Sequence, residues 1–562
     1  MIDAGHRVTG LWRTPRLAPR LWLMALCAGL PAVEAVALTG FKMRGSVPLA
    51  PGVTAAAPYG IYHDLRFLLA YHFSWTAFAV EAATMLVWRT ALDTSLVLLA
   101  WPAGHPRPPA RVITRRTALF TLTAAAALLP SAAAASAMGV MPVSDLLLGG
   151  LPVLVIFATL TPHGAVTSWW RQVPPWRAAA WSAATFGVIT VGGSVAAAAP
   201  AWAAPLAAGV TGLFNALARA GIIRASIGVG QRAPRSVPIV PLGMAAMAGA
   251  VIAAITLTMR LSGGVDPAGY QMASQTTTGP RVLLIGGFNS AWDGSPAPPI
   301  GPGLPVERFS YRGLDAAGYP LPYPPQATQR PLDQTVRLLA GQVRALHTRS
   351  GRPVSIVADS EGSLAAQAYL AVSPHAPVDK VILLDPLIDP GRDFFPPSTA
   401  EGWGVATGAI LRGLGAAVGA TTPLHIYADG PFIRSVDDHG PDLQDLLACP
   451  HGQATELVLS SLADAVASPY SAKIAAPAGV VLRLHGFLLG DATAARTITA
   501  FLDTGRYPRS DGGTAADRLI RAAAAAWQAP PLAPALVPRW TGEPVSGCSA
   551  KRRALAAWLL GQ

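Results

Sequence analysis

Three polar residues in the second half of the chain have the types and the order needed for nucleophilic catalysis. Ser360 stands in PVSIVADSEGSLAAQAYL (353–370), where an apolar run meets a polar turn and then an alanine-rich helical pattern. Asp429 ends the run LHIYAD, and His485 follows VVLRL. A serine hydroxyl becomes a nucleophile when a histidine takes its proton and a carboxylate holds that histidine. The three residues therefore predict acyl transfer through a serine.

Each candidate also has a simpler interpretation. In Ala358-Asp359-Ser360-Glu361-Gly362, alanine stands where a nucleophile elbow favours its first glycine. A serine ahead of a helix is commonly an N-cap, so this pentapeptide alone is a weak signal. Asp437 and Asp438 remain alternatives to Asp429 as the acid, and a lone histidine such as His485 is often structural.

The segment Gly286-Gly287-Phe288 predicts the remaining part of such a site. Glycines at a strand end let the backbone approach a substrate, so we expect the N–H groups of Phe288 and Glu361 to form an oxyanion hole. The alternative is an ordinary glycine turn. The three cysteines form no paired CxxC motif, and we expect neither a metal nor an organic cofactor.

The elements that must position these residues are short apolar runs that alternate with helical stretches. Strands are predicted at 281–288, 354–359, 380–386, 424–429 and 480–487, and helices at 332–347, 361–373 and 492–502. Such alternation is typical of a mostly parallel α/β sheet with helices on both faces. Reactive groups gather at the carboxyl ends of the strands in such sheets, and the candidates occupy these positions.

The order Ser360, Asp429, His485, each at a strand end, resembles that of the α/β-hydrolase family of lipases and esterases. The resemblance covers roughly 280–502 and includes the Gly-Gly-Phe strand end, RFSYRG (308–313) and LHGFLLGD. It implies cleavage of an ester through an acyl-enzyme, or acyl transfer to another alcohol. The acids on both sides of Ser360 depart from the family pattern and disfavour an anionic group beside the nucleophile.

The first half of the chain has the composition of a membrane protein. Hydrophobic residues make up 52%, charged residues 13%, and mean hydropathy is +0.40. About seven spans are predicted, with six and eight as alternatives, at 21–40, 67–101, 117–140, 145–162, 178–199, 201–222 and 237–259, with the second read as one tilted span. The first has an alternative interpretation as a cleavable signal sequence.

The distribution of charge favours a membrane over nucleic acid as the partner of this basic chain. Residues 1–262 carry 19 Lys/Arg and 6 Asp/Glu, or +13, whereas residues 263–562 carry 23 and 24, or −1. Basic residues fall in alternate loops, while the segment 41–66 is expected to be an external loop with few of them. The positive-inside rule then predicts a cytoplasmic N-terminus and an external second half. Cys449 and Cys548 would there be able to pair.

The predicted organisation is a multi-pass region (1–262), a linker (263–280), an α/β-hydrolase domain (281–502) and a helical, proline-rich extension (503–562) without assigned chemistry. We expect a serine hydrolase outside the cell membrane that acts on a lipophilic or cell-envelope ester. The alternative is a transport or envelope-assembly protein whose hydrolase-like domain is inactive and binds a ligand. The expected partners are the lipid bilayer and the ester, and not nucleic acid.

Overall fold

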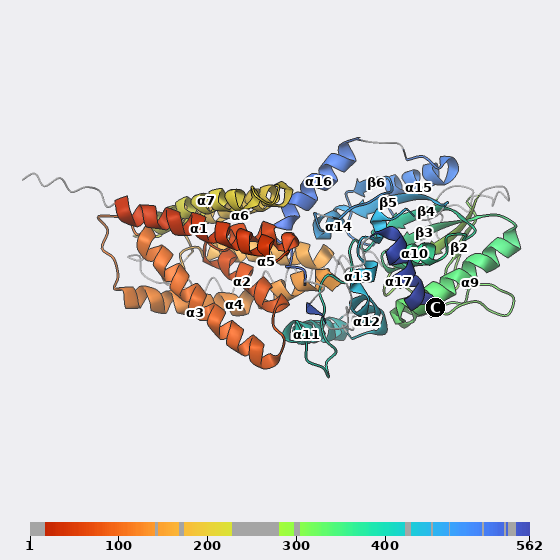
Figure 1. Cartoon of the computed structure of the whole chain (residues 1–562), viewed down its shortest axis with the longest axis horizontal. Coiled ribbons are helices and arrows are strands. Elements are labelled where there is room, and N and C mark those ends of the chain that lie inside the picture. The colour runs from red at the N-terminus through yellow and green to blue at the C-terminus, as the bar shows by residue number, and fades with distance from the viewer. Residues whose placement is uncertain are drawn as a thin grey trace, which may run out of the picture.

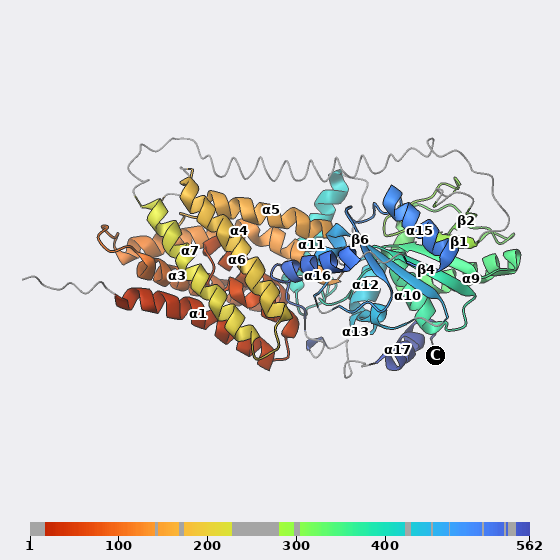
Figure 2. The same cartoon turned by 90° about the horizontal axis from the view of Figure 1, so that it is seen from above.

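Two regions lie at opposite ends of the long axis of the molecule (Figure 1, Figure 2). The computed structural model describes residues 17–140, 144–167, 173–227, 280–296, 300, 304–421, 429–450, 453–470, 472–507, 511–532, 536–537 and 547–561. One region is a bundle of helices from the first half of the chain. The other is a parallel sheet with helices, so the fold is a membrane-type bundle joined to an α/β domain.

Within the described residues, the bundle contains five helices that are long and apolar enough to cross a membrane, namely α1, α3, α4, α6 and α7. Its helices are α1 (Leu17–Gly40), α2 (Ala57–Ala70), α3 (Trp75–Ala100), α4 (Ala110–Val140), α5 (Ser144–Leu160), α6 (Trp176–Ala198) and α7 (Ala204–Ser226). Helix α5 is shorter, with 17 residues. The predicted span 237–259 lies outside the described residues, so the count of seven stays a prediction.

The single tilted span predicted at 67–101 is two separate helices. Helix α2 ends at Ala70, and α3 begins at Trp75 after Ser74, whose hydroxyl accepts a hydrogen bond from Ala77 N at 3.1 Å. A serine in this position satisfies one of the free N–H groups of a helix start. The cap therefore separates the two helices, and α3 alone has the length of a span.

The segment after α1 returns into the bundle instead of forming the expected external loop. The 3-10 helix η1 (Arg44–Gly52) and α2 meet at a buried bend, where Thr54 Oγ1 donates to Cys27 O, near the middle of α1, at 3.1 Å. Arg89 of α3 donates to Val53 O at 2.8 Å, and Arg219 of α7 to Ala55 O at 2.6 Å. Irregular backbone at membrane depth is stable only when its polar groups are paired, and these arginines supply the pairing.

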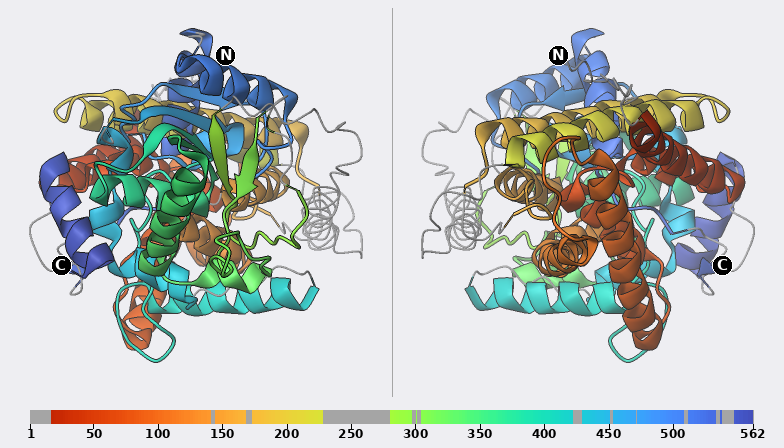
Figure 3. Two further views of the ribbon diagram at one scale, coloured as in Figure 1. Left: turned by 90° about the vertical axis from the view of Figure 1, so that its right-hand side faces the viewer. Right: turned by 90° about the vertical axis from the view of Figure 1, so that its left-hand side faces the viewer.

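The second region is built on six parallel strands in the order β2-β1-β3-β4-β5-β6. They are β1 (Arg281–Ile285), β2 (Val306–Arg308), β3 (Val354–Asp359), β4 (Val378–Leu384), β5 (Thr455–Ser461) and β6 (Ala478–Val481). Successive residues of β1 pack on opposite faces: Leu283 faces the cluster with α9 and α10, and Leu284 the cluster with α15. Helices thus cover both faces, as expected (Figure 3).

The helices of this region come mostly from between the strands. They are α9 (Leu332–Ser350), α10 (Glu361–Val372), α11 (Val405–Thr421), α12 (Pro431–Asp438), α13 (Gly440–Leu443), α14 (Leu462–Ala467), α15 (Ala492–Thr504), α16 (Asp511–Ala525) and α17 (Cys548–Leu560), with short 3-10 turns η4 (Pro325–Gln329) and η5 (Leu446–Ala448). Helix α17 joins α9 and α10 on one face of the sheet, and a disulfide between Cys449 and Cys548 holds its first residue.

The strand predictions hold in the centre of the sheet but miss two strands, the edge strand β2 and the strand β5. Strand β3 and helix α9 begin at the predicted residues, and β1, β4 and β6 overlap their predicted ranges. Residues 424–428 of the predicted strand LHIYAD lie outside the described part, and Asp429 stands in a turn before α12. The neighbour of β4 in the sheet is β5, TELVLSS, which was not predicted.

The carboxyl edge of the sheet faces the bundle. Helix α14, which follows β5 directly, packs against α5, and its Ala467 belongs to an apolar cluster of the bundle. The loop after β4 reaches the end of α4, where Arg392 N donates to Gly139 O at 2.5 Å. Groups at the carboxyl ends of β4 and β5 therefore lie on the bundle side of the domain.

The C-terminal extension joins the two regions. Helix α16 packs against α6 and α14. Beyond it, Trp527 stacks on Phe186 with ring centroids 4.5 Å apart, and its Nε1 donates to Thr190 Oγ1 at 2.9 Å. Arg66 of α2 donates to the carbonyls of Ala526 and Gln528. The residues without assigned chemistry thus brace the sheet against the bundle.

Candidate active site

Ser360 occupies a sharp turn between β3 and α10. Its backbone has φ 51° and ψ −115°, a strained conformation for a residue other than glycine. Ser360 N donates to Leu384 O at 2.9 Å, and Ser363 Oγ donates to Ser360 O at 2.6 Å, so the turn is fixed from both sides. The strand order reverses between β1 and β3, and this turn lies at that switch point, where open α/β sheets bind ligands.

His485 joins Ser360 to an aspartate. Its Nε2 lies 2.9 Å from Ser360 Oγ, and its Nδ1 lies 2.8 Å from each carboxylate oxygen of Asp464. A carboxylate can only accept hydrogen bonds, so Nδ1 carries a proton, and in the neutral ring Nε2 is left to accept from the hydroxyl. The arrangement has the geometry of a nucleophile, a base and an orienting acid.

The aspartate beside His485 is therefore not the one favoured from the sequence. Asp429 instead accepts from Arg412 Nη1 at 3.1 Å, and its side chain is partly exposed. Asp437 is buried on α12 and pairs with Arg434, while Asp438 ends the same helix. The prediction of Asp429 rested on a strand at 424–429, whereas the aspartate that contacts His485 follows β5.

The sequence just before Asp464 contains a pattern that indicates a strand followed by a helix start. The run Glu456–Ser461 combines three consecutive apolar residues with a terminal serine, and Ser461 Oγ accepts from Asp464 N at 3.3 Å as the N-cap of α14. A strand followed by Ser-x-x-Asp is a helix-start pattern. It would have placed an acid just beyond a strand end.

The glycine loop after β1 packs directly against Ser360. A Cβ atom added to Gly287 would lie 2.8 Å from Ser360 Cβ, and one added to Gly362 would lie 2.6 Å from Ile285 Cγ2. Both contacts are closer than real side chains tolerate, so these positions require glycine. Among the described residues, neither the N–H of Phe288 nor that of Glu361 donates a hydrogen bond. Both predicted oxyanion donors are therefore free to bind a ligand.

A fourth residue, Asp385, links the loops that carry His485 and Asp464. It is fully buried at the end of β4, with φ 44°. Its Oδ1 accepts from Ser461 N at 2.5 Å and its Oδ2 from Gly486 N at 2.8 Å. Because Ser461 caps the helix of Asp464 and Gly486 follows His485, Asp385 fixes the distance between base and acid. Nothing in the sequence analysis singled it out.

The carboxylates around His485 determine its charge. Burial disfavours the imidazolium, but nearby acids outweigh burial and raise the pKa of His485 to about 10. Asp464 contributes most, followed by Asp385 and Asp359. Burial and the neighbouring Asp464 in turn raise the pKa of Asp385 well above its usual range. The neighbouring carboxylates thus favour the protonated form of His485.

The two acids that flank Ser360, Asp359 and Glu361, are both buried. Burial raises the pKa of Asp359 to about 6 and the pKa of Glu361 well above its usual range. Among the described residues, neither carboxyl oxygen of Glu361 has a hydrogen-bond partner, which fits a protonated acid. The expected repulsion of anions therefore comes at most from Asp359, whose Oδ2 lies near Gly287.

Asp385, Asp464 and His485 also have the side-chain types of a metal site, with ligand atoms within 4.8 Å of one another. Their donor atoms are, however, already engaged with one another and with Ser461 N and Gly486 N. Hydrogen bonding therefore accounts for the close approach of the three side chains.

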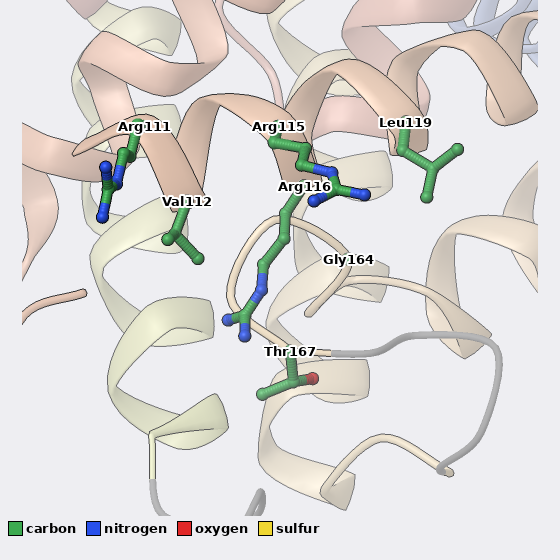
Figure 4. A pocket seen from close by; sticks show the side chains of 7 residues that line it. All are labelled: Arg111, Val112, Arg115, Arg116, Leu119, Gly164 and Thr167. Atoms are coloured by element: carbon green, nitrogen blue, oxygen red, sulfur yellow. The ribbon is translucent and has the colours of Figure 1, made fainter. Parts of the chain in front are cut away.

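A basic cavity of about 460 Å³ lies far from this site, at the beginning of α4 (Figure 4). Arg111, Arg115 and Arg116 line it together with Thr167, and Arg116 Nη1 donates to Val166 O at 2.6 Å. Helix α4 has 31 residues, or about 46 Å of length, and its other end touches the loop after β4. The cavity and Ser360 are thus separated by the length of the bundle.

Comparison with known proteins finds no matching family model, no matching curated protein and no matching solved structure for this chain.

Proposed function

We propose that this chain is a membrane-anchored serine hydrolase that cleaves the carboxylic ester of a lipophilic substrate. One observation carries the proposal: Ser360 Oγ, on a strained strand-to-helix turn, lies 2.9 Å from His485 Nε2, and Asp464 faces the other ring nitrogen at 2.8 Å. The turn and the chain order of serine, aspartate and histidine resemble those of the α/β-hydrolase family.

In the proposed reaction, neutral His485 takes the proton of Ser360 as Oγ attacks the ester carbonyl. The N–H groups of Phe288 and Glu361 donate to the developing oxyanion. The bond to the alcohol breaks, and His485 returns its proton to the leaving oxygen. A water molecule, or an acceptor alcohol in a transferase, then loses its proton to His485, attacks the acyl-enzyme and restores the serine.

The position of the site supports a substrate from the bilayer. The carboxyl edge of the sheet, which carries Ser360, faces the bundle, and α14 packs against α5. On the loop of His485, Leu482 is 78% and Leu484 40% exposed. Apolar side chains in solvent next to a candidate base suit contact with an acyl chain or a lipid surface.

The charge pattern supports an external location for the α/β domain. Three arginines gather at the far end of the bundle, where the positive-inside rule expects cytoplasm. The disulfide between Cys449 and Cys548 is a bond of oxidising compartments. A periplasm-active reporter enzyme fused after Gln562 should be active, whereas a reporter that works only in the cytoplasm should be silent. The reverse pattern would refute this orientation.

A second candidate function is transport or envelope assembly with an inactive α/β domain. It is favoured by an ionic chain inside the bundle, where His63 lies 2.9 Å from both Glu34 and Asp64, and Asp64 pairs with Arg89. Ionisable groups in a membrane region are expensive and often functional. In this chain they also hold the buried bend after α1, which is a structural role.

Ester turnover separates the two candidates. The full-length protein in detergent micelles, given p-nitrophenyl esters of increasing chain length, should cleave the longer esters faster. Ser360→Ala should abolish turnover, and Ser373→Ala, at the far end of α10, should leave it unchanged. Absence of turnover in the unmodified protein, or equal turnover in Ser360→Ala, would favour the inactive binding domain.

A further inference from the structure

A cavity of about 580 Å³ lies between the bundle and the α/β domain, on the side of the carboxyl edge of the sheet. The bundle contributes the segment after α1, with Lys42 and Arg44, and the turn between α6 and α7. The domain contributes the loop after β4, with Arg392 and Asp389. The cavity thus lies where the spanning helices end and the α/β domain begins.

Aromatic side chains mark this level as the membrane boundary. Phe41, beside Lys42, and Trp202, in the turn before α7, are each 76% exposed. Large aromatic residues are enriched where a membrane protein passes from hydrocarbon to headgroups. The cavity therefore opens at the depth of lipid phosphates.

The cavity is cationic. Within the described part of the chain, neither Lys42 nor Arg44 forms an ion pair, and Arg392 Nε is buried without a hydrogen-bond partner. Two acids, Asp389 and the exposed Asp445, also line the cavity, and desolvation raises the pKa of Asp389, which favours its neutral form. A buried guanidinium nitrogen without an acceptor calls for an anionic ligand, and guanidinium and ammonium groups both bind phosphate.

The lining loops are the loops of the candidate active site. Asp389 follows Asp385 in the loop after β4, and Asp385 binds the backbone beside His485. Tyr470, also in the lining, follows α14, the helix of Asp464. A headgroup held in this cavity would lie beside the loops that position the base and the acid.

We infer that this cavity binds the phosphate of a membrane phospholipid through Lys42, Arg44 and Arg392. The inference rests on the proposed function in one respect, because the bound lipid would then present its ester on the side of Ser360. It specifies the substrate class as phospholipids in preference to neutral acylglycerols.

Lipid binding and turnover test the inference separately. Native mass spectrometry of the full chain, with phosphatidylglycerol and with diacylglycerol of the same acyl chains, measures binding without catalysis. The double variant Lys42→Gln/Arg44→Gln should weaken phosphatidylglycerol binding about tenfold, the loss expected for two exposed charge contacts. Diacylglycerol binding should not change, and free inorganic phosphate should compete weakly because it lacks the acyl chains.

Arg111→Gln, in the basic cavity at the other end of the bundle, is the matched control and should retain the affinity for phosphatidylglycerol. Equal affinities of the double variant and the unmodified protein would overturn the inference, and so would an equal loss in Arg111→Gln. If phospholipid binds as expected and no ester is cleaved, the binding site stands and the proposed hydrolase activity fails.

Discussion

Asp464 faces Nδ1 of His485 with both carboxylate oxygens at 2.8 Å, while Asp429 pairs with Arg412 elsewhere in the domain. Replacing Asp464 by Asn removes the group that holds the ring and stabilises its charge. We expect kcat to fall by about 10³- to 10⁴-fold, as for loss of the acid in such triads. Asp429→Asn is the matched control and should retain kcat within about twofold. Steady-state turnover of a p-nitrophenyl ester measures both, and a larger loss in Asp429→Asn would contradict this assignment.

The charge of His485 predicts an alkaline activity profile. The base must be neutral, and its pKa is raised to about 10, so the active fraction grows as pH rises. We expect kcat/KM to increase about tenfold per pH unit from neutrality and to level off near pH 10. An activity plateau already reached at pH 7 would show that the acids around His485 do not hold its proton.

Replacing Asp385 by Asn should disturb the positions of the loops that carry His485 and Asp464, and the change should be visible in the pH profile of activity. Asn in its place keeps one acceptor oxygen and turns an amide N–H₂ toward either Ser461 N or Gly486 N, which breaks one of the two contacts. We expect kcat to fall about tenfold, and the acid limb to move to lower pH because one carboxylate beside His485 is lost.

The control for Asp385→Asn is Asp379→Asn, at the other end of β4, where the carboxylate accepts only from Ser355 Oγ among its described contacts. This variant should leave the pH profile unchanged. A drop in kcat for Asp385→Asn with an unshifted acid limb would indicate a purely structural role.

A side chain at position 287 should collide with the candidate nucleophile, Ser360. A methyl group there would lie 2.8 Å from Ser360 Cβ, so Gly287→Ala must displace either the serine or the oxyanion loop. A displacement of about 1 Å at a reacting group is enough for a loss of about 100-fold in kcat/KM. Gly341→Ala, on α9 with open space around its Cβ, should keep full activity. Full activity of Gly287→Ala would show that this loop does not border the reaction.

The sequence predicted the parts of the fold that local pattern determines. Strand β3, helix α9 and the positions of Ser360 and His485 at the ends of apolar runs were readable because each signal lies within a few residues. The aspartate that contacts His485 was missed because LHIYAD looks more like a strand than TELVLSS does. Sequence pattern alone does not reveal which run pairs with β4.

The bend after α1 was missed for a different reason. Apolar periodicity distinguishes a span from a loop, and residues 41–56 have the glycine and proline content of a loop. Arg89 and Arg219, more than thirty residues away in the chain, donate to its carbonyls and make its burial possible. Such pairing depends on the assembled bundle and leaves no local signal.

Covalent labelling of Ser360 tests the central claim most directly. The full-length protein in micelles is treated with a fluorophosphonate at pH 9, where His485 begins to lose its proton, and the modified peptide is identified by mass spectrometry. The account predicts one adduct, on Ser360, that is absent in Ser360→Ala, strongly reduced in Asp464→Asn and retained in Asp429→Asn. No adduct on Ser360, or the same labelling in Ser360→Ala, would contradict the account.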